Sequence, residues 1–123
     1  MIYSLWSPDG RYITGLSEAD GRRELYDMKT KTWRLLQLPH PSNYWCWSRD
    51  GSYLYFDSNW RKDPGVFRYR VKDGKSERVA SLKGIRRVSG SFDKWFGLGP
   101  GDAPMLLRDT GSSQIYAVDW EAP

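Results

Sequence analysis

The sequence predicts an all-β protein built from repeated four-stranded antiparallel units. The main observation is a turn motif that occurs twice, as Trp6–Gly10 and, 41 residues later, as Trp47–Gly51. A second observation is that short alternating segments lie between clusters of Gly, Asp, Ser and Thr, as in strands joined by hairpins. No stretch has the sustained 3.6-residue period of an amphipathic helix, so we expect almost no helix. A regular spacing of about 40 residues is typical of stacked repeats.

Each copy of the motif predicts a tight hairpin turn between two strands. The aspartate carboxylate can accept hydrogen bonds from backbone N–H groups of the turn, and the glycine supplies the left-handed residue that a bulged hairpin needs. Because both aspartates have this structural role, we do not expect them to act as a catalytic carboxylate pair. The residues to which we assign the structural motif are Trp6, Ser7, Asp9, Gly10, Trp47, Ser48, Asp50 and Gly51.

The first unit spans about residues 3–38. Both faces of its second strand carry apolar residues, as expected of a strand that is covered on two sides. Polar turns at 18–21 and 29–32 separate the later strands. The four strands that we expect are residues 3–6, 11–17, 23–28 and 33–38.

The second unit spans about residues 44–82 and follows a proline-containing linker. An inserted loop at 59–65 separates its second and third strands. In the third strand, aromatic residues alternate with arginines, which places them on opposite faces. The four strands that we expect are residues 44–47, 52–58, 66–71 and 76–82.

The third unit, at about residues 86–120, departs from the pattern. Segments 86–90 and 95–98 lead to Gly99–Asp102, which stands where the earlier units have Ser-x-Asp-Gly. Strands are expected at 105–109 and 114–120, and no fourth strand follows them. We therefore expect this unit to be incomplete.

These repeats resemble the blades of TolB-type β-propellers, a WD-like family in which a Trp-Ser-Pro-Asp-Gly turn leads into an apolar strand. The resemblance rests on both motif copies and on Glu24–Asp27 and Tyr116–Asp119, which match the family's Ile-Tyr-x-x-Asp strand. It implies a closed ring of six or more blades, so that three blades would be about half of a six-bladed ring. In bacteria such blades often follow a winged-helix or protein kinase domain, so the resemblance also implies a role in sensing or protein interaction.

The charge of the chain is mildly positive, at +4 from 19 basic and 15 acidic residues. The basic residues are scattered, which disfavours nucleic-acid binding. The apolar runs are shorter than the ~20 residues of a membrane span, and the N-terminus lacks the layout of a secretory signal. The single cysteine, Cys46, permits no disulfide within the chain. These features favour a soluble protein and a cytoplasmic location.

The residues with reactive side chains form no catalytic or metal-binding pattern. A zinc site needs three or four Cys, His or carboxylate ligands at close spacing, whereas this chain has one histidine, His40, and one cysteine. His40 lies between two prolines in a linker, and Cys46 is expected to be a buried, unreactive thiol. We therefore predict no catalytic residue, no metal and no cofactor.

Three arginines are candidates for an anion-binding site. Arg68 and Arg70 share one face of a strand, and Arg87 begins the third unit. If the three met at one rim, they could bind a carboxylate or phosphate through paired hydrogen bonds. The alternative is that they are solvated residues whose aliphatic stems cover aromatic rings.

The predicted function is that of a non-enzymatic module for protein interaction or ligand sensing. Two alternatives stay open: blades that only close a ring, and a degenerate propeller hydrolase or lyase. The expected partner is either a second copy of this chain or further blades of a longer polypeptide. The unpaired edge of an incomplete third unit favours such association over a simple monomer.

Overall fold

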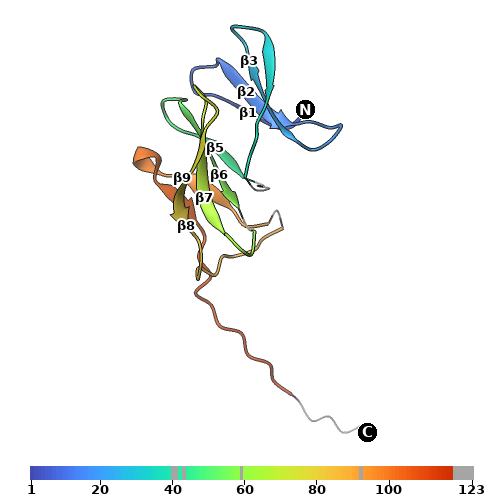
Figure 1. Ribbon diagram of the computed structural model, residues 1–123. Helices are drawn as coiled ribbons and strands as arrows, with labels where there is room; N and C mark the ends of the chain where they lie inside the picture. Colours follow the sequence, from blue (N-terminus) through green and yellow to red (C-terminus); the bar gives the residue numbers. More distant parts are fainter. Residues whose placement is uncertain (40–41, 43, 59, 92, 118–123) are drawn as a thin grey trace.

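The computed structural model describes residues 1–39, 42, 44–58, 60–91 and 93–117, and these form three antiparallel β-sheets (Figure 1). The prediction of an all-β fold is confirmed, because the only helical segment in this part of the chain is the short 3-10 helix η1 (Pro100–Asp102). No helix among these residues is long and apolar enough to cross a membrane.

The first sheet is a four-stranded meander in which each strand pairs with the next one in the sequence. Its pairing register places Leu16 opposite Arg23, and Tyr12 opposite Asp27. The strands are β1 (Ile2–Trp6), β2 (Tyr12–Leu16), β3 (Arg23–Asp27) and β4 (Thr32–Leu35).

The second sheet repeats this order. Its register places Asp57 opposite Val66 and Tyr53 opposite Arg70. Of the loop predicted at 59–65, residues 60–64 separate β6 from β7, Gly65 is instead the first residue of β7, and residue 59 lies outside the described residues. The strands are β5 (Trp45–Trp47), β6 (Tyr53–Ser58), β7 (Gly65–Arg70) and β8 (Ser76–Ser81).

The third sheet is smaller than predicted. It contains only β9 (Phe96–Leu98) and β10 (Pro104–Leu106), with η1 between them. The strand expected at 86–90 is reduced to isolated bridges, one of which pairs Arg87 with Arg108. The prediction of a strand at 114–117 is wrong, since these residues form no ladder and extend away from the sheets (Figure 1). A strand needs a neighbour to satisfy its backbone groups. The rest of that predicted strand, 118–120, lies outside the described residues.

The first Trp-Ser-Pro-Asp-Gly turn is held together by its own side chains. The Ser7 hydroxyl donates to the Asp9 carboxylate at 2.6 Å and accepts the N–H of Tyr12 at 2.9 Å. Asp9 also accepts the N–H of Arg11 at 3.1 Å. Gly10 has a φ of 70°, the left-handed conformation expected from the motif.

The second turn has matching hydrogen bonds. The Ser48 hydroxyl donates to Asp50 at 2.8 Å and accepts the N–H of Tyr53 at 2.9 Å. Asp50 also accepts the N–H of Ser52 at 2.9 Å, and Gly51 has a φ of 73°. The repeated sequence therefore encodes a repeated turn, and it fixes where the following strand begins.

The hydrophobic core fills both sides of the second sheet. A stack of three rings runs through it, with Trp45 and Phe56 centred 4.4 Å apart and Phe56 and Phe67 5.6 Å apart. One cluster packs this sheet against the first: Leu25, Leu36, Trp45, Leu54, Phe56, Phe67, Tyr69 and Val71. A second cluster packs it against the third: Tyr55, Val66, Leu82 and Phe96.

Candidate functional site

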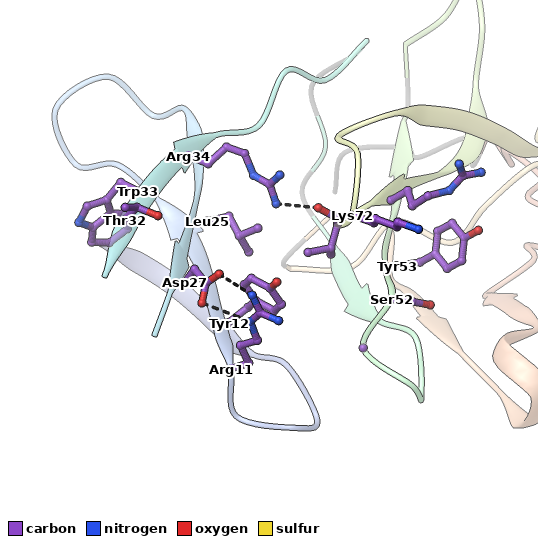
Figure 2. A pocket seen from close by; sticks show the side chains of 13 residues that line it. Arg11, Tyr12, Leu25, Asp27, Thr32, Trp33, Arg34, Ser52, Tyr53 and Lys72 are labelled. Carbon is purple, nitrogen blue, oxygen red and sulfur yellow. Dashed lines mark hydrogen bonds and ion pairs between the residues drawn. The ribbon is translucent and has the colours of Figure 1, made fainter. Parts of the chain in front are cut away.

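A groove of about 840 Å³ lies at the junction of the first two sheets (Figure 2). One wall comes from strands β2, β3 and β4, and the other from the turn between β5 and β6, the start of β6 and the end of β7. Two tyrosines, Tyr12 and Tyr53, occupy equivalent repeat positions on the opposing walls. The lining residues are Arg11, Tyr12, Leu25, Asp27, Thr32, Trp33, Arg34, Gly51, Ser52, Tyr53, Arg70, Val71 and Lys72.

Arg34 connects the two walls of the groove. Its side chain extends from β4 toward the second sheet, and its Nη2 donates to the carbonyl oxygen of Val71 at 2.9 Å (Figure 2). The guanidinium carbon also lies 5.7 Å from the centre of the Tyr69 ring. Among the residues that the structure describes, no carboxylate forms an ion pair with Arg34, so this side chain keeps its attraction for an anion.

The first wall contains an ion pair between neighbouring strands. Arg11 donates to Asp27 through Nε at 3.3 Å and Nη2 at 2.9 Å (Figure 2). The hydrogen bond from the Arg11 side chain, with further bonds from the backbone N–H groups of Lys29 and Thr30, lowers the pKa of Asp27 to about 2. This carboxylate is therefore ionised and occupied at neutral pH.

The charge of the groove is positive overall. Four cationic side chains line it, and Asp27 is the one carboxylate among its lining residues. Arg70 donates to Asp73, which lies outside the lining, at 2.9 Å. Within the described part of the chain, Lys72 forms no ion pair and is exposed. A groove that combines exposed cations with tyrosine and tryptophan rings suits an acidic ligand with aromatic groups.

The three arginines predicted as an anion site lie in different surroundings. Arg70 lines the groove, whereas Arg68 and Arg87 do not. Arg68 forms an ion pair with Glu77, and its guanidinium carbon lies 4.2 Å from the centre of the Tyr53 ring. Arg87 is buried in another ion pair, described below. The structure therefore does not bring the three together at one rim.

The other sequence-derived candidates are placed as follows. The hydrogen bond from Ser7 lowers the pKa of Asp9, and the hydrogen bond from Ser52 is the main cause of the lowering of the pKa of Asp50 to about 2. Cys46 is half-buried, and burial raises the pKa of its thiol. His40 lies outside the described residues.

Sequence reasoning missed the cations that dominate the groove, Arg34 and Lys72. Arg34 is followed by a run of apolar residues, and Lys72 begins an ordinary turn, so neither carries a motif. Arg11 and Asp27 could have been found. Each directly follows a recognisable element, namely the Asp-Gly turn and the Leu-Tyr pair of the third strand.

Comparison with known proteins supports the fold. No protein-family model and no curated protein matches this sequence. Solved structures match it, among them an oligogalacturonate lyase in complex with manganese, with a TM-score of 0.51 and 19% sequence identity. The match covers 85% of this chain, which spans 33% of the length of that protein. At this identity the likeness shows the fold alone: the sheets are blades of a β-propeller, as predicted.

Proposed function

We propose that this chain supplies blades of a TolB-type β-propeller that acts as a non-enzymatic interaction module, and that the groove of Figure 2 binds an acidic segment of a partner protein. The observation that carries this proposal is the positive charge of the groove, in which neither Arg34 nor Lys72 forms an ion pair with a carboxylate of the described residues. The TolB assignment is supported by the two matching turns. The remaining blades of the ring come from a longer polypeptide or from a second copy.

Several carboxylates that could serve as general acids or bases are already occupied, which supports binding over catalysis. Asp9 and Asp50 accept hydrogen bonds within their turns. Asp27 is held by Arg11, and Asp57 is buried against Arg87. A carboxylate whose oxygens are already occupied by structural hydrogen bonds or an ion pair is poorly placed to exchange a proton with a substrate.

A catalytic role is the second candidate, because the matching solved structure is a lyase that holds manganese. Titration with manganese chloride distinguishes the two. A rise of several degrees in the thermal midpoint of the 123-residue chain would favour the catalytic candidate.

Fluorescence anisotropy with a labelled peptide of alternating glutamate and phenylalanine tests the proposed function. We expect saturable binding that weakens as salt is raised, because exposed charges are screened. Lys72→Glu should weaken binding by about fivefold or more. Lys83→Glu, which makes the same charge change at an exposed position outside the groove, should leave binding unchanged. Equal binding by both variants, or no binding by the unmodified chain, would overturn the proposal.

A further inference from the structure

A buried arginine lies at the junction of the first two blades, and no carboxylate of the described residues pairs with it. Arg23, the first residue of β3, is only 4% exposed. Its Nη1 lies 3.5 Å from the carbonyl oxygen of Tyr3, and its guanidinium carbon lies 4.6 Å from the centre of the Trp45 ring. Its Nε has no hydrogen-bond partner, and among the described residues no carboxylate forms an ion pair with it.

The next junction also buries an arginine, but there the chain supplies the counterion. Arg87 donates to Asp57 at 2.7 Å, and the two side chains are 4% and 1% exposed. Arg87 also donates to the carbonyl oxygens of Lys94 and Trp95, which precede β9, at 3.3 Å and 2.9 Å. At the second junction the charge of the buried arginine is therefore balanced by a carboxylate of the chain itself.

The repeat explains why the first junction differs. Asp57 lies in β6 opposite Val66, and the equivalent position in β2 is Leu16, which lies opposite Arg23. Leu16 therefore occupies, at the first junction, the position at which the second junction has the carboxylate of Asp57. Among the described residues, the first junction therefore holds a buried cation, Arg23, and no equivalent of Asp57.

A buried cation without a counterion is costly, which makes the site attractive to an anion. Burial lowers the pKa of Arg23 to about 10, so the side chain still carries its charge at neutral pH. An anion bound to the guanidinium would offset the cost of burying the charge of Arg23, as Asp57 does for Arg87 at the other junction. It would also satisfy the unpaired Nε.

Arg23 lines a cavity of about 660 Å³, a volume within the range of small-molecule sites. Much of the lining is aromatic or aliphatic, and two serines add hydroxyl groups. Arg23 is the one charged residue of this lining, which favours a singly charged anion over a phosphate dianion. The lining residues are Tyr3, Ser4, Leu5, Leu16, Arg23, Ser42, Tyr44 and Trp45.

We propose that this cavity binds a small monocarboxylate with a flat, apolar body, whose carboxylate pairs with Arg23 and whose body lies against the side chains of Tyr3, Leu5 and Leu16. The guanidinium fork matches a carboxylate in geometry, and the tyrosine and leucine side chains of the lining provide an apolar surface. None of the lining residues belongs to the groove of Figure 2, so this site stands independently of the proposed partner-binding surface.

Calorimetric titration of the 123-residue chain with benzoate, naphthoate and indole-3-acetate tests the proposal. We expect at least one of these monocarboxylates to bind saturably below about 10 mM, a range typical of fragment-sized ligands. The neutral amide of the same compound should bind at least about tenfold more weakly, because it cannot pair with the guanidinium. Absence of binding by all three acids, or equal binding of acid and amide, would overturn the proposal.

Three variants locate the site. Arg23→Gln removes the cation, and Leu16→Asp introduces a carboxylate at the position equivalent to Asp57, so either change should abolish binding. Leu16→Asp keeps the test valid if Arg23→Gln fails to fold, because it leaves the arginine in place with an internal counterion. Arg22→Gln is the control at a neighbouring exposed arginine and should bind as the unmodified chain does. Unchanged affinity in folded Arg23→Gln or Leu16→Asp would contradict the assignment.

Discussion

The indole N–H of Trp47 donates a hydrogen bond to the carbonyl oxygen of Leu5 at 3.4 Å, and this bond joins β5 of the second blade to β1 of the first. The Trp47 ring also stacks on Tyr12, with ring centres 6.3 Å apart. The tryptophan of the turn motif therefore connects one blade to the blade before it. Trp6, which holds the same position in the first blade, is 55% exposed.

We predict that the two motif tryptophans differ in their effect on stability. Trp47→Ala should lower the free energy of unfolding by about 2–4 kcal/mol, because it removes a packed ring and the bond to Leu5. In the dissociated single chain, Trp6→Ala should cost less than about 1 kcal/mol, because this ring is largely in solvent there. Urea denaturation followed by circular dichroism measures both. Equal losses for the two variants would contradict the role assigned to Trp47.

The turn glycines provide a second prediction. Gly10→Val and Gly51→Val should each destabilise the chain by about 1–3 kcal/mol, because a β-branched residue adopts a positive φ only under strain. No atom lies within 4 Å of the side chain that Gly10 lacks, so the cost there is conformational rather than steric. Gly10→Asn is the matched control, since asparagine tolerates the left-handed conformation, and it should cost clearly less than valine. Equal thermal midpoints for Gly10→Val and Gly10→Asn would count against this explanation.

The buried ion pair at the second junction provides a third prediction. Asp57→Asn should destabilise the chain by about 3–5 kcal/mol, because it leaves the charge of Arg87 buried without its counterion. Asp73→Asn removes an ion pair to Arg70 whose side chains are 39% and 32% exposed, and should cost only about 0–1 kcal/mol. Chemical denaturation of both variants provides the comparison. Replacing the buried pair by apolar residues of similar size, as in the double variant Asp57→Leu and Arg87→Met, should recover much of the loss.

Acid should weaken the fold through carboxylates that bond to neighbouring groups. The pKa of Asp27 and of Asp50 is lowered from 3.8 to about 2 in the folded chain. Both carboxylates therefore stabilise the folded state fully above pH 3.8, and this contribution is lost as the pH falls toward 2. We expect the thermal midpoint to fall over this interval, and Asp27→Asn and Asp50→Asn each to flatten the decline. Identical acid profiles for the variants and the unmodified chain would refute this assignment.

The sequence predicted the turns and the two complete blades because both depend on local chemistry that is repeated. The groove could not be predicted in the same way. Arg34 meets the backbone of Val71 across two blades, and no local pattern specifies which turn faces which strand. Arg87 was expected at a strand start on a rim, whereas the fold buries it against a carboxylate 30 residues earlier. Such long-range pairings are set by blade packing rather than by sequence spacing.

The difference between the two junctions was nonetheless present in the repeat. A comparison of the two copies, 41 residues apart, shows Leu16 where the second copy has Asp57. That comparison does not reveal the buried arginine opposite Leu16, because the loops after the second strands differ in length. The register of β2 with β3 was needed to bring Leu16 and Arg23 together.

The last prediction concerns association of the blades. The outer parts of the first and third blades expose large apolar side chains, among them Ile2, Trp6 and Leu107 at 45%, 55% and 51%. Burying about 400 Å² of such surface contributes about 10 kcal/mol before the entropy of association is subtracted. We therefore expect the 123-residue chain to form a two-fold dimer in which two sets of blades complete one ring.

Light scattering at micromolar concentration measures this association. The double variant Ile2→Ser and Trp6→Ser should shift the dimer toward monomer. Trp60→Ser is the control, because Trp60 is 47% exposed but lies in the loop between β6 and β7, and it should leave the mass unchanged. We expect the double variant to dissociate and Trp60→Ser to remain dimeric if the second copy covers the exposed face of the first blade. A stable monomer of the unmodified chain would show instead that these apolar side chains tolerate solvent and that the ring needs other blades.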